Sequence, residues 1–398
     1  MMQKNQRLRL RCERLGSELE GVCLHEGMPV FVPGVLPGEE ADVLCVKAQP
    51  RYAFGRLIEV LTPSPDRADP PCPVYDRCGG CSGQHMRYEA TLAAKRAQVF
   101  DCLTRIGGLS LEPEDVPPVL GAGHPWRCRN KTALPVGGTA DAPVLGFYRR
   151  RSHQIVPIDD CPVSMGGLTG VISAVKEWMR AERVQPYDEE TGRGLLRHVV
   201  TRVSRAGSLM VVLTATRVKL PGVPSLVERL TARAPGFCSL HVSVNAGRNN
   251  VILGRESHRL YGEDAIFETL LGLTFEMPPL SFFQVNPDQT ERLYQTAVDF
   301  AVLAPGDVAV DAYAGAGTLS LCLARHASRV IGIEIVPQAV EGARRNAARN
   351  AVANAEFHVA AVEDLLPRLV ADGLRPDVIL LDPPRKGVEP AVIDAVLA

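Results

Sequence analysis

The last 125 residues alternate strand-like and helix-like segments, and this alternation restricts the fold more than any other feature of the chain. Short apolar runs rich in Val and Ile are each followed by a longer segment of helical character. Such a βαβ rhythm predicts a parallel, doubly wound sheet with helices on both faces. The expected strands are residues 307–312, 329–334, 355–360 and 377–382.

The first of these strands runs into a glycine-containing loop that opens the next helix. Gly315 and Gly317 allow backbone to approach a ligand, and the helix N-terminus offers free N–H groups. Glu334 follows Gly317 by 17 residues at the end of the next strand, where a carboxylate can accept bonds from both ribose hydroxyls. The spacing is not the G-x-G-x-x-G of a pyrophosphate loop, so S-adenosylmethionine is favoured over a dinucleotide. The alternative is a tight turn beside a surface glutamate.

A second motif, Asp382-Pro-Pro-Arg385, ends the fourth strand at the same carboxyl edge of the sheet. The prolines deny the backbone donors that would continue a ladder and hold the loop stiff. In enzymes that methylate exocyclic amines of bases, the comparable motif ends in an aromatic residue, whereas Arg385 stands here. This difference indicates methylation of carbon, and the alternative is a plain strand-ending turn.

Three cysteines, Cys72, Cys78 and Cys81, lie within ten residues, and Gly79 and Gly80 let the chain wrap an inorganic core. Three sulfur ligands require a fourth, and Cys161 in a loop before Pro162 is a candidate. Sulfur-only ligation suits zinc or a [4Fe-4S] cluster, and the spacing does not separate the two. A disulfide is disfavoured because nothing resembling a secretory signal follows the basic N-terminus, so we expect a reducing cytoplasm.

Charge and hydropathy limit how this chain could interact with a membrane or with a nucleic acid. No apolar run approaches the roughly 18 residues of a membrane span, and the net charge of -1 gives no global attraction to polyanions. A nucleic-acid surface would have to be local. Five Lys and Arg residues between Lys4 and Arg14, and six between Arg127 and Arg151, could form a phosphate track, or they could be solvated faces.

The N-terminal part predicts a separate β-rich unit. Short strands between residues 7 and 60, broken by Gly- and Pro-containing turns, favour a small OB-like barrel. Five prolines from Pro63 to Pro73 then form a stiff linker, and a helix is expected from Tyr88 to Ile106. We therefore expect domains at residues 1–62, 63–270 and 271–398.

Together these segments resemble the RNA uracil-5 methyltransferase family. The similarity runs from about residue 7 to the last residue and is marked by CPVYDRCGGCSGQHMRYEATLAAK, DDCPV, SFFQVNPDQTERLY, DAYAGAGTLSL and LDPPRKG. The N-terminal PVFVPGVLPGEEADV resembles that family's TRAM domain, an RNA-binding barrel. The TRAM-bearing branch is more similar to the 23S ribosomal RNA enzymes than to the transfer RNA enzymes.

The resemblance implies a multidomain α/β protein: an OB-like barrel, a central α+β domain with a [4Fe-4S] cluster, and a Rossmann-like methyltransferase sheet. It implies RNA as partner and S-adenosylmethionine as cofactor. Either Phe282 or Phe283 could contact the extruded base, and the alternative for each ring is a place in the apolar core. Where a polar adenine contact is expected the chain reads Ala360-Ala361-Val362, so that contact passes to Glu363, Asp364 or backbone. The implied ligands are Cys72, Cys78, Cys81 and Cys161 for the cluster, and Gln284, Tyr313, Gly315, Gly317, Thr318, Glu334 and Asp382 for the cofactor.

Carbon-5 methylation also needs a cysteine nucleophile and a carboxylate base. The family carries the nucleophile in a Ser-Cys-Asn-Pro segment about 25 residues beyond Asp-Pro-Pro, whereas the sequence ends at Ala398, 16 residues after Asp382. We therefore expect a truncated, incomplete sheet and a monomer that does not methylate RNA by itself. The alternatives are a transfer RNA uracil-5 methyltransferase and a non-catalytic RNA-binding scaffold.

Overall fold

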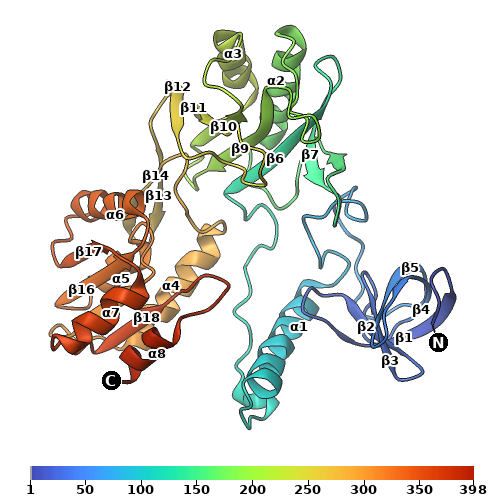
Figure 1. Cartoon of the computed structure of the whole chain (residues 1–398), viewed down its shortest axis with the longest axis horizontal. Helices are drawn as coiled ribbons and strands as arrows, with labels where there is room; N and C mark the ends of the chain where they lie inside the picture. Colours follow the sequence, from blue (N-terminus) through green and yellow to red (C-terminus); the bar gives the residue numbers. More distant parts are fainter. Residues whose placement is uncertain (1) are drawn as a thin grey trace. The chain divides into compact units, whose positions relative to one another are not determined.

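The computed structural model describes residues 2–398 and divides into two compact units (Figure 1). The first unit comprises Met1–Pro125 and Phe147–Ile158, and the second comprises Trp126–Gly146 and Asp159–Ala398. No helix in the described residues is both long and apolar enough to cross a bilayer. The expected boundaries at residues 62 and 270 stay a prediction.

The first unit contains a closed five-stranded barrel, which confirms the predicted N-terminal β-rich unit. Its strands β1 (Arg7–Leu15) and β4 (Glu40–Ala48) alternate buried apolar residues, which point inward, with more exposed and often charged residues, which point outward. Val30, Val32, Val43, Cys45 and Ala53 are fully buried in its core. Around the barrel the order is β1-β2-β3-β5-β4, with bounds β1 (Arg7–Leu15), β2 (Gly21–His25), β3 (Met28–Val32), β4 (Glu40–Ala48) and β5 (Ala53–Thr62).

The linker that leaves the barrel is fastened to it by one buried ion pair. Glu39 is fully buried and accepts hydrogen bonds from the Arg67 guanidinium at 2.6 Å, from Ser64 N at 3.0 Å and from Leu36 N at 2.8 Å. The expected helix follows as α1 (Tyr88–Asp101), which continues in a π-helical turn, η1 (Cys102–Ile106). The unit also holds a 3-10 turn, η2 (Pro113–Asp115), and β8 (Ile155–Pro157).

The second unit begins with a central sheet in the order β12-β11-β10-β9-β6-β7. Every residue of β9 and β10 is buried, as expected of strands covered on both faces. The helices α2 (Leu168–Ala181) and α3 (Val223–Arg233) contact each other and bury apolar faces. The strands are β6 (Lys131–Gly138), β7 (Pro143–Tyr148), β9 (Leu196–Val203), β10 (Leu209–Ala215), β11 (Phe237–Val244) and β12 (Ser257–Gly262).

The C-terminal residues form the predicted parallel sheet, in the order β17-β16-β15-β18. The chain moves outward from β15 to β17 and returns to the other side of β15, so strand order reverses between β15 and β18. Ligands of open α/β sheets bind at the carboxyl ends of strands beside such a reversal. The strands are β15 (Val308–Ala312), β16 (Arg329–Glu334), β17 (Ala355–Val359) and β18 (Val378–Leu381).

Helices cover both faces of this sheet. One core joins α5 and α6 to the preceding hairpin and α4, and the other joins α7 and α8 to the opposite face. These elements are β13 (Ile266–Leu270), β14 (Leu273–Met277), α4 (Pro287–Ala301), α5 (Thr318–Leu323), α6 (Pro337–Arg349), α7 (Val362–Ala371) and α8 (Pro390–Leu397).

Close packing in this sheet gives a stability prediction. A Cβ at Gly332 on β16 would lie 2.5 Å from Phe357 Cδ1 and 3.1 Å from Ala314 Cβ, so Gly332→Ala forces core atoms apart. We expect a loss of about 1–3 kcal/mol in unfolding free energy, measured by denaturant titration. Gly306→Ala is the matched control, because a Cβ there meets no atom within 4 Å. Equal stability of the two variants would contradict the packing.

Candidate functional site

The loop between β15 and α5 exposes backbone at the carboxyl edge of the sheet. Gly315 and Gly317 both have positive φ, at 56° and 75°. A Cβ at Gly317 would lie 2.9 Å from Ala343 Cβ and from Phe357 Cζ, so glycine is needed there for packing. A Cβ at Gly315 would meet nothing within 4 Å. The loop is therefore held tightly on one side and open on the other, where a ligand can approach the backbone.

Tyr313 in the same loop adopts a backbone conformation that side chains rarely take, with φ of 84°. Such a residue costs on the order of 1–3 kcal/mol and persists where its surroundings hold it. Here the N–H groups of Tyr313 and Ala314 both donate to the Ile333 carbonyl, at 3.0 and 2.9 Å. This strain lies at the predicted cofactor loop, where strained residues are common.

Glu334 connects the end of β16 to the glycine loop. Its Oε2 accepts a hydrogen bond from Gly315 N at 3.0 Å, and its Oε1 accepts one from Val336 N at 2.8 Å. Each carboxylate oxygen keeps a further lone pair, so the group can accept two ribose hydroxyls. Beside it Ile335 and Val336 are 64% and 46% exposed. A carboxylate next to bare apolar surface suits a ribose joined to a flat base.

Three carboxylates give this edge a negative potential. Asp311 is buried at the end of β15, and Ser320 Oγ donates to its Oδ2 at 2.5 Å. Burial raises the pKa of Asp311 to about 6, and the charges of Asp382 and Glu334 add to the increase. Asp382 itself is exposed. The predicted residues Glu334 and Asp382 therefore both contribute to the negative electrostatic potential around Asp311, and this potential favours a ligand with positive charge.

Thr318 opens α5 and joins it to α4. Its Oγ1 is 2.7 Å from the hydroxyl of Tyr294, and burial raises the pKa of that tyrosine, so the phenol stays neutral. Asn346 on α6 holds the loop just before Thr318, because its Nδ2 donates a hydrogen bond to Ala316 O at 3.0 Å. Asn346 was not among the residues predicted for the site, although it stands out as an asparagine in the buried stripe of Val340, Ala343 and Ala347.

The predicted Gln284 lies in the segment just before α4, and the central sheet holds this segment by its backbone. Asn130 Nδ2 donates to Gln284 O at 2.9 Å, and Asn130 N donates to Val285 O at 2.8 Å. The buried Arg202 on β9 donates to Ser281 O. Asn286 then caps α4 by accepting from Gln289 N at 3.2 Å. The position of Gln284 therefore depends on residues more than 80 positions away in the chain, and no local pattern indicated Asn130 or Arg202.

The two phenylalanines of this segment are not equivalent, and burial decides between the two alternatives that the sequence left open for each ring. Phe283 is only 4% exposed and packs against Phe275 with 6.5 Å between ring centroids. Phe282 is 70% exposed. Of these two rings, Phe282 is therefore the one available to a ligand.

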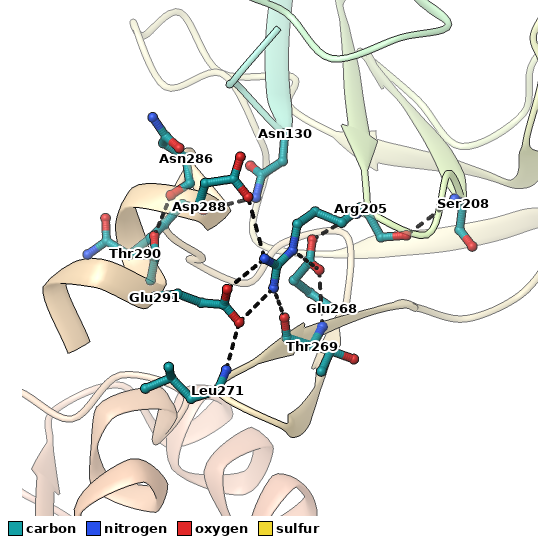
Figure 2. Close-up of polar contacts among 12 residues, drawn as sticks. Asn130, Arg205, Ser208, Glu268, Thr269, Leu271, Asn286, Asp288, Thr290 and Glu291 are labelled. Carbon is teal, nitrogen blue, oxygen red and sulfur yellow. Dashed lines mark hydrogen bonds and ion pairs between the residues drawn. The ribbon is translucent and has the colours of Figure 1, made fainter. Parts of the chain in front are cut away.

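An arginine that sequence analysis missed joins the central sheet to α4 and β13 (Figure 2). Arg205, in the turn after β9, contacts Glu291 at 2.8 Å, Glu268 at 3.2 Å and Asp288 at 3.4 Å, and also donates to Thr269 O. Glu291, and to a smaller extent Glu268, raise the pKa of Arg205, so the guanidinium stays charged. Figure 2 shows the guanidinium at the centre of the group, with Asn130 beside the start of α4.

The predicted cysteine ligands fall in different units. Cys72, Cys78 and Cys81 lie half-buried in one loop of the first unit, where Gly80 N donates to Cys78 Sγ at 3.4 Å. A Cβ at Gly79 would lie 2.8 Å from Tyr148 O. Cys161 belongs to the second unit, and Arg127 donates to its carbonyl at 3.0 Å. Over residues 2–398, no three His, Cys, Asp or Glu side chains are gathered as a metal site. The four-cysteine site stays a prediction.

Cys322 is the cysteine next to the glycine loop, on α5. It is buried, its Sγ donates to Thr318 O at 3.2 Å, and burial raises its pKa to about 12. A thiol with such a pKa is not a nucleophile near neutral pH. Cys322 is therefore unsuited to act as a catalytic thiol.

Two sequence families match parts of the chain, and close relatives match nearly all of it. Residues 303–394 match the methyltransferase domain family, and residues 2–58 match the TRAM domain family. An uncharacterized RNA methyltransferase of Halalkalibacterium halodurans is 42% identical over 395 residues, which is 99% of this chain and 86% of the relative. One of Clostridium tetani is 40% identical over 396 residues, 99% of this chain and 85% of the relative.

A solved structure also resembles the whole chain. The crystal structure of the Pyrococcus abyssi tRNA (uracil-54, C5)-methyltransferase in complex with S-adenosyl-L-homocysteine has a TM-score of 0.77 and 26% sequence identity. The similarity covers 98% of this chain and 86% of that chain.

The buried Asp311 predicts a dependence of stability on pH. In the folded protein its pKa is about 6, above the ordinary value of 3.8. Protonated Asp311 therefore contributes fully to the free energy of unfolding below about pH 4, and this contribution is lost as the pH rises through 6. Relative to Asp311→Asn, the wild-type free energy of unfolding should fall by about 2–3 kcal/mol between pH 4 and 7. Asp299→Asn, at an exposed site on α4, should follow the wild type. If the difference in unfolding free energy between the wild type and Asp311→Asn did not change with pH, the raised pKa of Asp311 would be disproved.

Proposed function

We propose, from the premise that this chain belongs to the RNA methyltransferases, that it serves the transfer of a methyl group from S-adenosylmethionine to carbon 5 of a uridine in RNA, although residues 1–398 do not themselves hold the expected nucleophile. The observation that carries the proposal is the likeness over 98% of the chain to a uracil-C5 methyltransferase, at a TM-score of 0.77. The TRAM match at residues 2–58 supports an RNA substrate.

The residues at the carboxyl edge of the sheet fit the donor in chemistry and shape. Glu334 would accept the two ribose hydroxyls, and the exposed Ile335 would cover the adenine face. Asp382 would attract the positive end of the donor, and the negative charge of the buried Asp311 would strengthen this attraction. Gly315 leaves its backbone open for close approach. When bound, the donor supplies an electrophilic methyl group on a sulfonium ion. The remaining predicted contacts are Gln284, Tyr313, Gly317 and Thr318.

Phe282 is the residue best placed to contact the substrate base. Its ring is exposed, and the backbone on either side is fixed by Arg202 and Asn130. An aromatic ring on a fixed backbone can stack on a base that has left its helix, at a gain of about 1–3 kcal/mol. Gln284, two residues on, would then lie between the base and the donor.

Carbon 5 of uracil is a weak nucleophile, so the proposed reaction passes through a covalent adduct. A thiolate adds to carbon 6, the resulting enolate attacks the methyl group, and the donor leaves as the neutral thioether. A base then removes the carbon-5 proton and the thiolate is expelled. The resemblance assigns the thiolate to a Ser-Cys-Asn-Pro segment, which is not present in residues 1–398. Cys322 is unsuited to the role because of its high pKa.

The proposed substrate is a uridine of 23S ribosomal RNA, on the resemblance to the TRAM-bearing branch of the family. The alternative is a transfer RNA, which is supported by the tRNA (uracil-54, C5)-methyltransferase of similar structure. Both substrates use the same donor site and the same chemistry at carbon 5.

Deleting the gene distinguishes the two substrates. We expect 5-methyluridine to disappear from 23S ribosomal RNA, as measured by mass spectrometry of nucleosides from separated RNA classes. Return of the gene carrying Glu334→Gln should restore at most about a tenth of the methylation rate, because a charged hydrogen bond contributes about 1.5–3 kcal/mol.

The same gene carrying Glu341→Gln, a matched change at an exposed site on α6, should restore full methylation. Loss of 5-methyluridine from transfer RNA alone would favour the alternative substrate. An unchanged nucleoside content in every RNA class would overturn the proposed function.

We further propose that Cys72, Cys78, Cys81 and Cys161 hold a [4Fe-4S] cluster. The sulfur-only donor set supports it, as does the N–H group of Gly80 directed at Cys78 Sγ, which stabilises a thiolate. Close contact of Gly79 with Tyr148 O leaves no room for a side chain at position 79. Zinc is the competing occupant of such a site.

Reconstitution without oxygen tests the cluster. With ferrous iron and sulfide the protein should acquire about four iron atoms per chain and a broad visible absorption. Cys81→Ser should lose most of both, whereas Cys102→Ser, at the exposed cysteine after α1, should retain them. A colourless protein that binds one zinc ion would reject the cluster.

A further inference from the structure

Two cations lie directly opposite each other in the central sheet. Lys131 at the start of β6 is the cross-strand partner of Arg202 on β9, so both side chains leave the same face of the sheet. Arg202 is only 3% exposed, and Lys131 is half-buried. Like charges that face each other across two strands destabilise a sheet, and burial of the charges adds to this cost.

Neither charge is compensated by an acid. Within residues 2–398, the Lys131 ammonium group forms no hydrogen bond or ion pair, and Arg202 donates only to the Ser281 carbonyl. The Nε of Arg202 is buried without an acceptor. Burial lowers the pKa of Arg202 to about 10, and burial together with the charge of Arg202 lowers the pKa of Lys131. No carboxylate opposes these shifts, so both groups keep their capacity to bind an anion.

The acidic groups closest in the chain are engaged elsewhere. The carboxylates at the start of α4 and on β13 are paired with Arg205. A third cation, Arg129, is exposed, and its charge also lowers the pKa of Lys131. The positive groups therefore run from the exposed Arg129 through the half-buried Lys131 to the buried Arg202.

This pair of cations belongs to the strand positions that hold the segment around Phe282. Arg202 donates to the carbonyl just before Phe282. Asn130, which precedes Lys131, donates to the carbonyls two and three residues after Phe282. The exposed ring that is proposed to contact the base therefore stands on backbone bracketed by the two strands that carry the cations.

We propose that Lys131 and Arg202 bind a phosphate group of the RNA, next to the uridine that stacks on Phe282. A guanidinium fork and an ammonium group suit the oxygens of a phosphate. A phosphate is charged throughout binding, whereas an enolate oxygen is charged only during the reaction, so a permanent repulsion between cations favours phosphate. The proposal rests on the proposed function and deepens it, because phosphate contacts fix the register of the RNA.

Lys131→Met tests the proposal, because methionine keeps the apolar stem and removes the charge. Binding of a fluorescently labelled 12-nucleotide RNA with one central uridine is measured by anisotropy. Affinity should fall by about 10- to 100-fold, as expected for the loss of a charged hydrogen bond. The slope of log affinity against log salt should decrease by about 0.7. Lys219→Met, the same change at an exposed site before α3, is the matched control and should bind as the wild type.

A second RNA shows whether the contact is made to phosphate. In this RNA the two phosphates that flank the uridine are replaced by uncharged methylphosphonates. The wild type and Lys131→Met should bind it equally, because both members of the contact are then already removed. The proposal is wrong if Lys131→Met binds the ordinary RNA as the wild type does, or if it weakens the binding of both RNAs by the same factor.

The free protein gives a readout that needs no RNA. Lys131→Met removes one of two facing, uncompensated cations, so it should raise the midpoint of urea denaturation above that of the wild type. Lys219→Met should leave the midpoint unchanged, because its side chain is exposed. A midpoint of Lys131→Met below that of the wild type would mean that the fold needs this charge, which contradicts a binding role for Lys131.

Titration with S-adenosylhomocysteine separates this proposal from the proposed function. Lys131→Met should bind this molecule with wild-type affinity. Weaker binding would assign the two cations to the carboxylate of the donor and overturn the phosphate site. Absence of binding in the wild type would count against the proposed function instead. Normal binding, combined with RNA affinities that do not depend on the flanking phosphates, would remove the phosphate site alone.

Discussion

The attachment of residues 281–291 to the central sheet is the constraint on which the candidate site depends. Asn130 and Arg202 bind backbone carbonyls on either side of Phe282, and Arg205 forms ion pairs with two carboxylates at the start of α4. Asn130 and Arg202 hold the backbone of residues 281–284 without using the side chains of that stretch, and the ion pairs of Arg205 add a second attachment at the start of α4. The central sheet therefore fixes the segment that carries Phe282 and Gln284, two residues of the candidate site.

On the other side of the site, the parallel sheet supplies a negative field and an open backbone. Glu334 uses one lone pair of each carboxylate oxygen to fix Gly315 and Val336, and it retains the others for a ligand. Asp311 is buried behind the loop at a cost that appears as its raised pKa. A positively charged donor would offset this cost, which is a physical reason for a methyltransferase to keep a destabilising carboxylate there.

Much of the fold follows from local patterns. Alternation of apolar residues along β1 and β4 defines the inner face of the barrel, and the βαβ rhythm after residue 306 defines the parallel sheet. The glycine loop and Glu334 were found because their spacing reflects one strand, one turn and one helix. Phe282 and Phe283 could not be separated in this way, since only the core shows which of two adjacent rings it takes.

The sequence by itself determined the order of the elements and the residues at the carboxyl edge of the sheet, because strand and helix periodicity acts over a few residues. Only the tertiary structure decided what holds that edge in place. Arg205 lies 63 positions before Glu268 and 86 before Glu291, and Asn130 lies 154 before Gln284. Such pairs form when packed sheets and helices bring distant loops together, and no local pattern records which distant partner a polar side chain will find.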